Sequence, residues 1–362
     1  MHEKKYTAAL IGTGRIGFTL GFDSRREQPA SHTMALLANR RIDLVAACDS
    51  DSARLAHWHR FIKKPETFLQ YSFLLATTKP DIVVIAVNES SHLQTALAAI
   101  RAKPKLVILE KPVALNCAEG EKIFLEAKKN SVPILINHER RFALDYAFAK
   151  KYLKNIGKIL SINARLDSGL KVFCEKEESS GEYSLLHDGT HLIDIISFFL
   201  EDEKTDLQYD FEDNGKNPCL FNAKITNLVC DEKDKTVVRN LGVHFSSKKC
   251  ADINMIISGE SRFFGFEVDI ICTEGRIRIG NGIFEFYKRV QSKLYTGFYS
   301  LERDLKAKPF VKTKYFSNMV KNAVDFLDKK EPLYSPLATG LRTLKIIEDV
   351  CMQIKAQLVK IL

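Results

Sequence analysis

The chain has 362 residues, of which 45% are hydrophobic and 27% charged, with a formal net charge of +9. This length exceeds what one hydrophobic core usually supports, so two domains are expected, and no apolar run is long enough to cross a bilayer. The basic residues are scattered in small groups among apolar positions, which does not favour nucleic-acid binding.

The eight cysteines are also scattered and contain no Cys-x-x-Cys pair. This spacing argues against a zinc site or a disulfide framework. It favours the reducing environment of the cytoplasm, so we expect a cytoplasmic protein without a metal.

Residues 1–137 are predicted to form a first domain in which buried strands alternate with helices. Strand-like runs lie at 8–11, 44–48, 82–86, 106–109 and 134–136. Helical patterns at 91–101 and 117–129 lie between them. This alternation is typical of an α/β fold with a doubly wound parallel sheet, the Rossmann arrangement.

Residues 138–362 are predicted to form a second α/β domain. Helical patterns cover 143–154, 192–200 and 340–362, and period-two runs lie at 237–245, 252–258 and 266–272. Strands without intervening helices predict a large, mostly antiparallel open sheet. Residues 201–235 are polar and poorly patterned, and we expect a variable loop there.

A glycine-rich turn follows the first strand directly. It contains Gly12, Gly14, Arg15, Ile16 and Gly17. Glycines at this spacing let the backbone approach the pyrophosphate of a dinucleotide, which then lies at a helix N-terminus. The turn therefore predicts a cofactor site.

Asp49 ends the next strand, where an acid accepts hydrogen bonds from the adenosine ribose and repels a 2′-phosphate. This favours NAD over NADP, although Arg54 softens the preference. Asp49 lies 32 residues after Gly17, more than the usual spacing of about 20. The excess predicts an insertion at 19–31, either a surface loop or a flap whose Arg25 or Arg26 contacts an anionic ligand.

The tripeptide Glu110-Lys111-Pro112 follows the buried run at 106–109. Ligand sites of open parallel sheets lie outside the carboxyl ends of the strands, so the lysine and the glycine turn are expected at one edge. A lysine beside a nicotinamide can hold and polarise the hydroxyl of an alcohol. The tripeptide therefore favours a dehydrogenase.

Five segments, taken in order, resemble the Gfo/Idh/MocA family of oxidoreductases. They are the glycine turn with Asp49, then 83–92, 110–112, 137–142 and 185–194. The resemblance implies a Rossmann domain followed by an open-sheet domain, and the oxidation or reduction of a hydroxyl on a sugar, sugar acid or cyclitol. It also implies a homodimer or homotetramer that associates through the C-terminal sheet.

The resemblance further assigns roles to single residues. Lys111 would hold the substrate hydroxyl and position the nicotinamide, His191 would transfer the proton, and Asp194 would orient that histidine or pack against its helix. The residues expected to contact the cofactor beyond the glycine turn are Asp49, Val87, Asn88, His92, Glu110 and Lys111. For His92, stabilisation of the helix after its strand is the competing interpretation.

The sequence departs from the family pattern at two places. The family commonly has an aspartate four residues before His191, whereas this chain has His187 followed by Asp188. Positions i and i+4 share a helix face, so both histidines are predicted to contact the substrate, with Asp188 and Arg140 beside them. Two imidazoles near a lysine suit an acidic substrate. The other departure is Val87-Asn88, where the family often has Thr-Pro.

The predicted function is an NAD(P)-dependent dehydrogenase acting on CH–OH groups, with NAD preferred. Two alternatives remain open. One is an NAD-dependent elimination or glycosidase-type enzyme of the same family, and the other is a non-catalytic regulator that senses the dinucleotide. The expected partner is a carbohydrate-like small molecule, a class that includes anionic sugar acids, and neither nucleic acid nor a membrane is expected to bind.

Overall fold

The computed structural model describes residues 4–201 and 220–361. The chain divides into two compact units, of which the first contains residues 1–143 and 312–341 and the second contains 144–311 and 342–362. Within the described residues, no helix combines the length and the apolar character that crossing a membrane requires.

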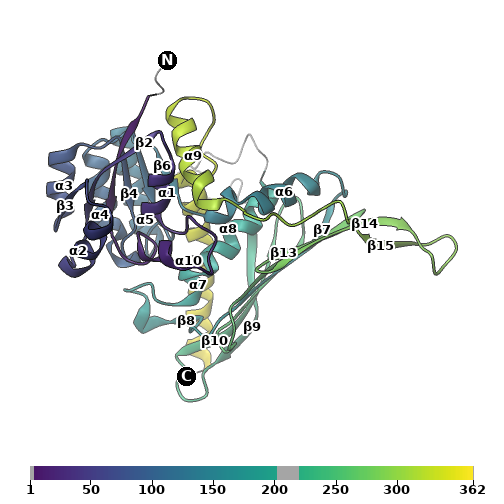
Figure 1. Ribbon diagram of the computed structural model, residues 1–362. Coiled ribbons are helices and arrows are strands. Elements are labelled where there is room, and N and C mark those ends of the chain that lie inside the picture. The colour runs from purple at the N-terminus through teal and green to yellow at the C-terminus, as the bar shows by residue number, and fades with distance from the viewer. Residues whose placement is uncertain (1–3, 202–219, 362) are drawn as a thin grey trace. The chain divides into compact units, whose positions relative to one another are not determined.

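The first unit is built on a six-stranded parallel sheet with the strand order β3-β2-β1-β4-β5-β6 (Figure 1). Its strands are β1 (Tyr6–Ile11), β2 (Ile42–Cys48), β3 (Glu66–Phe68), β4 (Ile82–Ile85), β5 (Leu106–Leu109) and β6 (Ile134–Ile136). Its helices are α1 (His32–Ala38), α2 (Ser52–Phe61), α3 (Tyr71–Thr78), α4 (His92–Arg101), α5 (Cys117–Asn130) and α9 (Tyr315–Leu327). The expected Rossmann sheet is confirmed, and only the short, largely exposed β3 was not predicted.

Helix α9 belongs to this first unit although it lies far along the chain. Its buried side chains, among them Phe316, Met319 and Val320, join the apolar core formed by β1, β2 and β4. Apolar burial of this kind is what holds a distant segment to a core. The predicted domain division at residue 137 stays a prediction, whereas the compact unit extends to Ala143 and includes 312–341.

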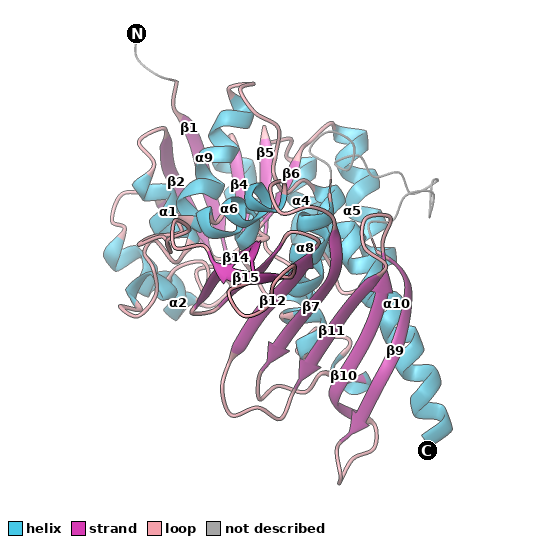
Figure 2. Cartoon of the chain, turned by 90° about the vertical axis from the view of Figure 1, so that its right-hand side faces the viewer, coloured by secondary structure: helices cyan, strands magenta, loops and turns pink. Residues whose placement is uncertain are grey.

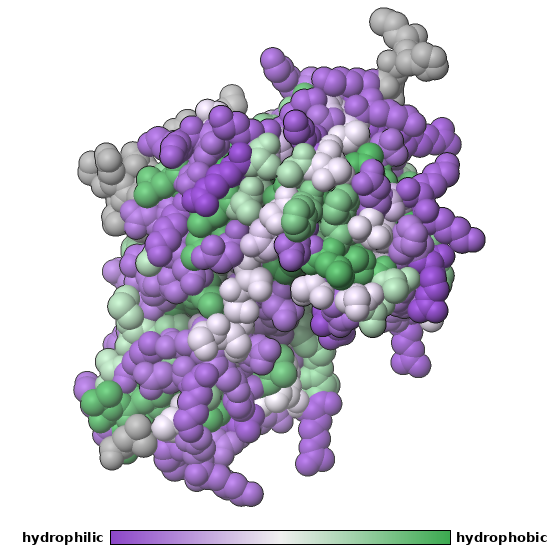
Figure 3. All heavy atoms as spheres, turned by 90° about the vertical axis from the view of Figure 1, so that its left-hand side faces the viewer, coloured by the Kyte–Doolittle hydropathy of each residue, from purple (hydrophilic) through white to green (hydrophobic). Residues whose placement is uncertain are grey.

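On the side of this unit that carries α2 and α3, hydrophilic side chains predominate and apolar ones form small groups among them (Figure 3). The exposed apolar residues on these elements and beside them include Phe61, Leu69 and Phe73. Apolar residues scattered singly are common on protein surfaces and need no partner.

The second unit is built on a nine-stranded mixed sheet (Figure 2). Its strands are β7 (Ile159–Asp167), β8 (Phe173–Cys174), β9 (Phe221–Cys230), β10 (Val237–Ser246), β11 (Asp252–Ser258), β12 (Gly265–Cys272), β13 (Gly275–Gly280), β14 (Ile283–Gln291) and β15 (Tyr299–Arg303). Among the described strands of this sheet, only β7 and β11 pair in parallel, so the predicted, mostly antiparallel sheet is confirmed. The helices are α6 (Leu144–Leu153), α7 (Ser184–His187), α8 (Gly189–Leu200) and most of α10 (Leu337–Ile361).

Burial alternates along the strands of this sheet, as in β12 and β13. Helix α8 packs on β7 and α6 packs on β13, so one face of the sheet is covered and the other stays polar. The loop expected at 201–235 is wrong for Phe221–Cys230, which form β9. Residues 202–219 of that expected loop lie outside the described residues.

Candidate active site

The glycine turn lies at the carboxyl end of β1, next to the end of β4. Gly12 has φ +99°, and a Cβ there would lie 2.3 Å from the carbonyl oxygen of Ala86. A Cβ on Gly17 would lie 2.0 Å from the carbonyl oxygen of Gly12, whereas one on Gly14 would meet only the Arg54 side chain at 3.7 Å. The outer glycines therefore allow close backbone packing, and the middle glycine leaves open space. This is the arrangement that a dinucleotide pyrophosphate requires.

The insertion predicted at 19–31 interrupts the helix that was expected to follow the turn. A short 3-10 helix, Thr19–Phe22, follows the turn, and α1 begins only at His32. The backbone N–H groups of His32 and Thr33 donate to the carbonyl oxygens of Ile16 (3.0 Å) and Gly17 (2.9 Å). In an uninterrupted helix, the N–H groups four residues further along would bond to these two carbonyl oxygens, so His32 and Thr33 take their place.

Side chains of the insertion fix it to the first unit. Glu27 accepts hydrogen bonds from the hydroxyl of Thr313 (2.9 Å) and from the backbone N–H of Lys314 (2.6 Å). Gln28 donates to the carbonyl oxygen of Asp23 (3.0 Å). Arg26 forms an ion pair with Asp23 at 3.4 Å, and Arg25 is exposed. The proposed role of these arginines as a flap stays a prediction.

Asp49 is buried and bound to the glycine turn. Its Oδ2 accepts hydrogen bonds from the backbone N–H (2.8 Å) and the hydroxyl (3.0 Å) of Thr13, and its Oδ1 accepts one from the N–H of Asp51 (2.9 Å). Arg54, one helical turn away, is ion-paired with Asp51 at 3.0 Å and lies beside Gly14. An acidic side chain, Asp49, and a basic one, Arg54, thus flank the turn. This arrangement alone favours neither NAD nor NADP.

Glu110 is buried directly after β5, where two side chains hold it. His32 Nε2 lies 2.6 Å from its Oε1, and Asn137 Nδ2 donates to the same oxygen at 2.7 Å. Burial raises the pKa of Glu110, but the hydrogen bonds from His32 and Asn137 and the nearby charges of His32 and Lys111 outweigh it, so its pKa is lowered. Glu110 is therefore an anion that fixes the strand end. Sequence reasoning did not identify His32 or Asn137 as its partners.

Lys111 is half-buried and is joined to Pro112 by a cis peptide bond. His92 lies behind this bond, with Nδ1 2.6 Å from the carbonyl oxygen of Pro112 and Nε2 3.1 Å from that of Val87. The competing interpretation of His92, a structural one, therefore has direct geometric support. Val87 is half-buried and Asn88 is exposed, and their contacts with a cofactor stay predictions.

The second unit carries the predicted acid–base residues. His187 ends α7 and His191 lies in the first turn of α8, with Asp188 between the two helices. All three are half-buried, while Asp194 is 1% exposed. Because the helix is interrupted at Asp188, His187 and His191 belong to two different helices, and the predicted i, i+4 spacing on one helix does not apply. His187 Nε2 lies 4.0 Å from Asp188 Oδ1, a distance at which an ion pair contributes little.

Arg140 belongs to a short 3-10 helix, Glu139–Phe142, in the first unit. Its guanidinium lies 3.3 Å from Glu139, and its side chain is largely buried. The neighbouring Arg141 is more deeply buried. The predicted substrate contact of Arg140 stays a prediction.

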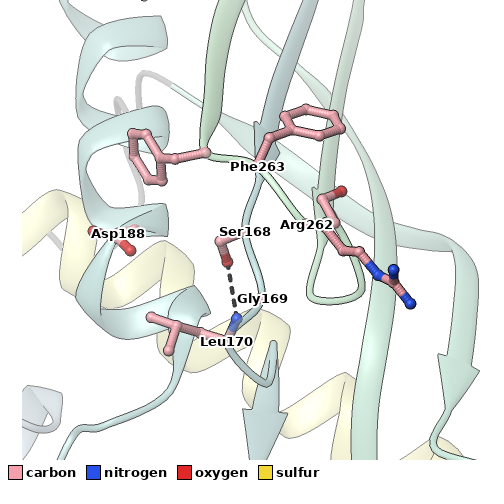
Figure 4. A pocket seen from close by; sticks show the side chains of 8 residues that line it. Ser168, Gly169, Leu170, Asp188, Arg262 and Phe263 are labelled. Atoms are coloured by element: carbon pink, nitrogen blue, oxygen red, sulfur yellow. Dashed lines mark hydrogen bonds between the residues drawn. The ribbon is translucent and has the colours of Figure 1, made fainter.

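A pocket of about 480 Å³ opens beside Asp188 in the second unit (Figure 4). It is lined by Ser168, Gly169, Leu170, Asp188, Ser261, Arg262, Phe263 and Phe264. Figure 4 shows Asp188 on the helix side, Ser168 between the helix and the β11–β12 loop, and the Arg262 guanidinium pointing away from both. Three of these residues, 168–170, directly follow β7. The loop at 261–264 was not predicted, because only tertiary contacts bring it to Asp188.

A family model described as an oxidoreductase family with an NAD-binding Rossmann fold matches residues 6–138. The chain is 31% identical over 160 residues to myo-inositol 2-dehydrogenase of Thermotoga maritima, covering 43% of this chain and 44% of the relative. It is 24% identical over 207 residues to D-glucoside 3-dehydrogenase of Escherichia coli, covering 55% of each. The matches thus span about half the length of these relatives.

Two solved structures share the fold over nearly the whole chain. An oxidoreductase from Agrobacterium radiobacter, in complex with NAD+, L-tartaric acid and magnesium, has a TM-score of 0.71 at 17% identity and 95% coverage of both chains. Biliverdin reductase from Synechocystis sp., in complex with biliverdin and NADP+, has a TM-score of 0.68 at 15% identity, covering 96% of this chain and 98% of that one. At this identity the likeness concerns the fold, and the neighbours include both forms of the cofactor.

Proposed function

We propose that this chain is an NAD(P)-dependent dehydrogenase acting on a CH–OH group of a sugar, sugar acid or cyclitol, because residues 6–138 match the model of the Gfo/Idh/MocA family of oxidoreductases. One observation carries the proposal. Lys111 follows the carboxyl end of β5, and the open glycine turn follows the carboxyl end of β1 in the same parallel sheet.

The first unit has the features that hold a dinucleotide. The space at Gly14 accommodates the pyrophosphate, and Asp49 lies where an acid can accept hydrogen bonds from ribose hydroxyls. When bound, NAD(P) supplies the acceptor or donor of the hydride. NAD is the preferred form in this proposal because of Asp49, and Arg54 beside Gly14 is the residue that would accommodate a 2′-phosphate.

The chain's own residues bind the alcohol and move its proton. The ammonium of Lys111 holds the substrate oxygen and stabilises the negative charge that develops on it, an effect that is large in a site screened from water. His191 accepts the hydroxyl proton, a role that suits an imidazole near neutral pH. His187, Asp188 and Arg140 contact the rest of the substrate in this proposal.

The pocket beside Asp188 supports a hydroxyl-rich substrate. Its volume lies in the range of small-molecule sites, roughly 300–1,000 Å³. The carboxylate of Asp188 and the hydroxyls of Ser168 and Ser261 can exchange hydrogen bonds with substrate hydroxyls, and the phenylalanines offer apolar surface to ring C–H groups. The carboxylate disfavours an acidic group at this point, so a neutral sugar or cyclitol fits better than a sugar acid.

The test begins with thermal unfolding of the protein with NAD, NADH, NADP and NADPH in turn. A ligand at a hundredfold excess over its dissociation constant adds about 2.7 kcal/mol of stability. The stabilising form is then incubated with neutral sugars, sugar acids and cyclitols while nicotinamide absorbance is followed. Net reduction supports a dehydrogenase. Product formation without net reduction indicates the elimination chemistry, and binding without turnover of any compound indicates a dinucleotide sensor.

A further inference from the structure

A pocket of about 650 Å³ lies at the amino end of the first unit's sheet, opposite to the edge that carries the glycine turn and Lys111. It is lined by residues of two segments, 72–81 and 98–105, which contain the ends of α3 and α4 and the turns into β4 and β5. The two helices are neighbours (Figure 1). The volume lies in the range of small-molecule sites, roughly 300–1,000 Å³. The pocket is therefore separate from the proposed cofactor site and large enough for a ligand of its own.

Two turns of the same sequence type contribute to this pocket. Lys79-Pro80 comes just before β4 and Lys103-Pro104 just before β5, and both lysines line the pocket. Strands β4 and β5 pair in parallel with Ile82 opposite Leu106, so each lysine lies three residues before an equivalent position. Because neighbouring strands lie about 4.8 Å apart, this register brings the two lysines side by side.

The charges of these two lysines are not balanced in the part of the chain that the structure describes. The other two cations of the lining already form ion pairs within the chain, namely Arg101 with Glu126 (3.2 Å) and Lys105 with Asp81 (2.6 Å). The ammonium groups of Lys79 and Lys103 form neither an ion pair nor a hydrogen bond with any described residue, and both side chains are exposed. A concave surface with an excess of one sign of charge raises the local concentration of counter-ions. The pocket is therefore suited to an anion.

The ends of the helices do not require these lysines. Lys79 (φ 41°) and Lys103 (φ 53°) have the left-handed backbone conformation that often ends a helix and that glycine adopts most easily. A basic side chain can also bond the last carbonyl groups of a helix. Here the backbone N–H groups of residues 79, 102 and 103 already donate to such carbonyl oxygens, those of Leu75, Ala98, Ala99 and Ile100. Lysine is thus less favourable than glycine for the turns themselves, whereas its ammonium group can bind a ligand.

We propose that this pocket binds a small molecule of the phosphate monoester class, in which the phosphate is joined to a flat apolar body. A phosphate monoester carries about −1.5 to −2 charges at pH 7, which matches the ammonium groups of Lys79 and Lys103. The two helix C-termini contribute only about half a negative charge each. The apolar body packs on three buried residues of the lining, Leu75, Pro80 and Pro104.

The first test is isothermal titration of the full chain with phenyl phosphate, which combines the two features of the proposed ligand. Phenol and inorganic phosphate each have one of these features and should bind at least tenfold more weakly. Saturating NAD should leave the affinity for phenyl phosphate unchanged, because the glycine turn lies at the other edge of the sheet. Absence of saturable binding, equal affinity for phenol or inorganic phosphate, or displacement of phenyl phosphate by NAD overturns the proposal.

The second test removes the two ammonium groups. The double variant Lys79→Gly/Lys103→Gly should bind phenyl phosphate at least tenfold more weakly, and its unfolding temperature should not fall, because glycine suits left-handed turns. Lys63→Ala/Lys64→Ala is the matched control, because it removes two exposed lysines that precede β3 at the same edge of the sheet. The control should bind phenyl phosphate as the wild type does. Equal losses of affinity in the two variants, or none in the glycine variant, overturn the proposal.

The third test uses the unaltered protein, so it does not depend on the folding of a variant. Brief treatment with acetic anhydride modifies exposed amino groups, and mass spectrometry measures the extent of labelling at each lysine. Phenyl phosphate should protect Lys79 and Lys103 from labelling and leave the labelling of Lys63 and Lys64 unchanged. Labelling of Lys79 and Lys103 that phenyl phosphate does not change overturns the proposal.

Discussion

Nδ1 of His92 lies 2.6 Å from the carbonyl oxygen of Pro112, the residue that follows Lys111. Burial lowers the pKa of His92 despite the two neighbouring carbonyl groups, so the ring is neutral at pH 7 and has a single N–H. We assign that proton to Nδ1 because its contact is shorter than the 3.1 Å from Nε2 to Val87. His92 thus fixes the backbone next to Lys111.

Replacing His92 by Phe should lower both stability and turnover. The change keeps a ring of similar size but leaves the carbonyl oxygen of Pro112 without its donor, which costs about 1–3 kcal/mol. Chemical denaturation measures the loss of unfolding free energy, and steady-state kinetics measures the loss of kcat. His59→Phe, at an exposed position of α2, is the control and should change neither. Unaltered stability of His92→Phe would exclude the structural role.

Lys111→Ala should impair turnover far more than dinucleotide binding. If the ammonium stabilises charge that develops in the transition state, its loss costs about 10²–10³ in kcat. Isothermal titration should meanwhile give a dissociation constant for the cofactor that is nearly unchanged. Lys105→Ala, just before the amino end of β5, is the control and should retain activity. Equal losses of kcat and cofactor affinity would contradict the proposed role of Lys111.

The glycine turn allows a paired test of binding and folding. Gly14→Ala adds a methyl group to open space, so the fold should keep its stability while the affinity for the dinucleotide falls. Gly17→Ala places a Cβ 2.0 Å from the carbonyl oxygen of Gly12, so it should lower the unfolding temperature without any ligand. Differential scanning calorimetry with and without cofactor separates the two effects. If Gly14→Ala binds the cofactor as the wild type does, the pyrophosphate does not lie at this turn.

Asp328 should make stability depend on pH. Hydrogen bonds from Arg41, Lys330 and Tyr6 hold the pKa of Asp328 well below its usual range, and they tie the segment 312–341 to β1 and β2. A lowered carboxyl pKa contributes stability above the unfolded value of about 3.9, and that stability is lost as pH falls through the folded value.

Asp328→Asn should therefore lower the unfolding free energy by roughly 1–2 kcal/mol at pH 7, and the difference from the wild type should shrink below about pH 4. Urea denaturation at a series of pH values checks this. Asp43→Asn, an exposed acid on β2, is the control. A difference that is constant from pH 7 to pH 3 would mean that the charge of Asp328 is not what stabilises the contact.

The parts of the site that could be predicted are those encoded by adjacent residues. A buried run followed by glycines locates the turn at Gly12, and a buried run followed by Glu110-Lys111-Pro112 locates the second strand end. Parallel sheets place such ends at one edge, so their common position follows from the alternation of strands and helices. The open sheet of the second unit was likewise predicted from its period-two runs.

The parts that could not be predicted depend on residues far apart in the sequence. His32 and Glu110 are 78 positions apart, and nothing local in either segment indicates their contact. The addition of α9 to the first unit, and of the loop at 261–264 to the pocket of Asp188, likewise depends on tertiary packing. Strand β9 was missed because its exposed and half-exposed residues lack a strong apolar alternation.

Residues 19–31 interrupt the helical hydrogen-bonding pattern that begins in the glycine turn. The pattern resumes at His32 and Thr33, whose N–H groups bond to residues before the insertion. Both ends of this insertion are therefore fixed by hydrogen bonds that do not depend on the number of residues in it. Loops of this kind accept added or deleted residues at small entropic cost. The segment can therefore be lengthened or shortened at this junction while the neighbouring backbone stays in place. Peripheral contacts could thus evolve independently of the buried framework.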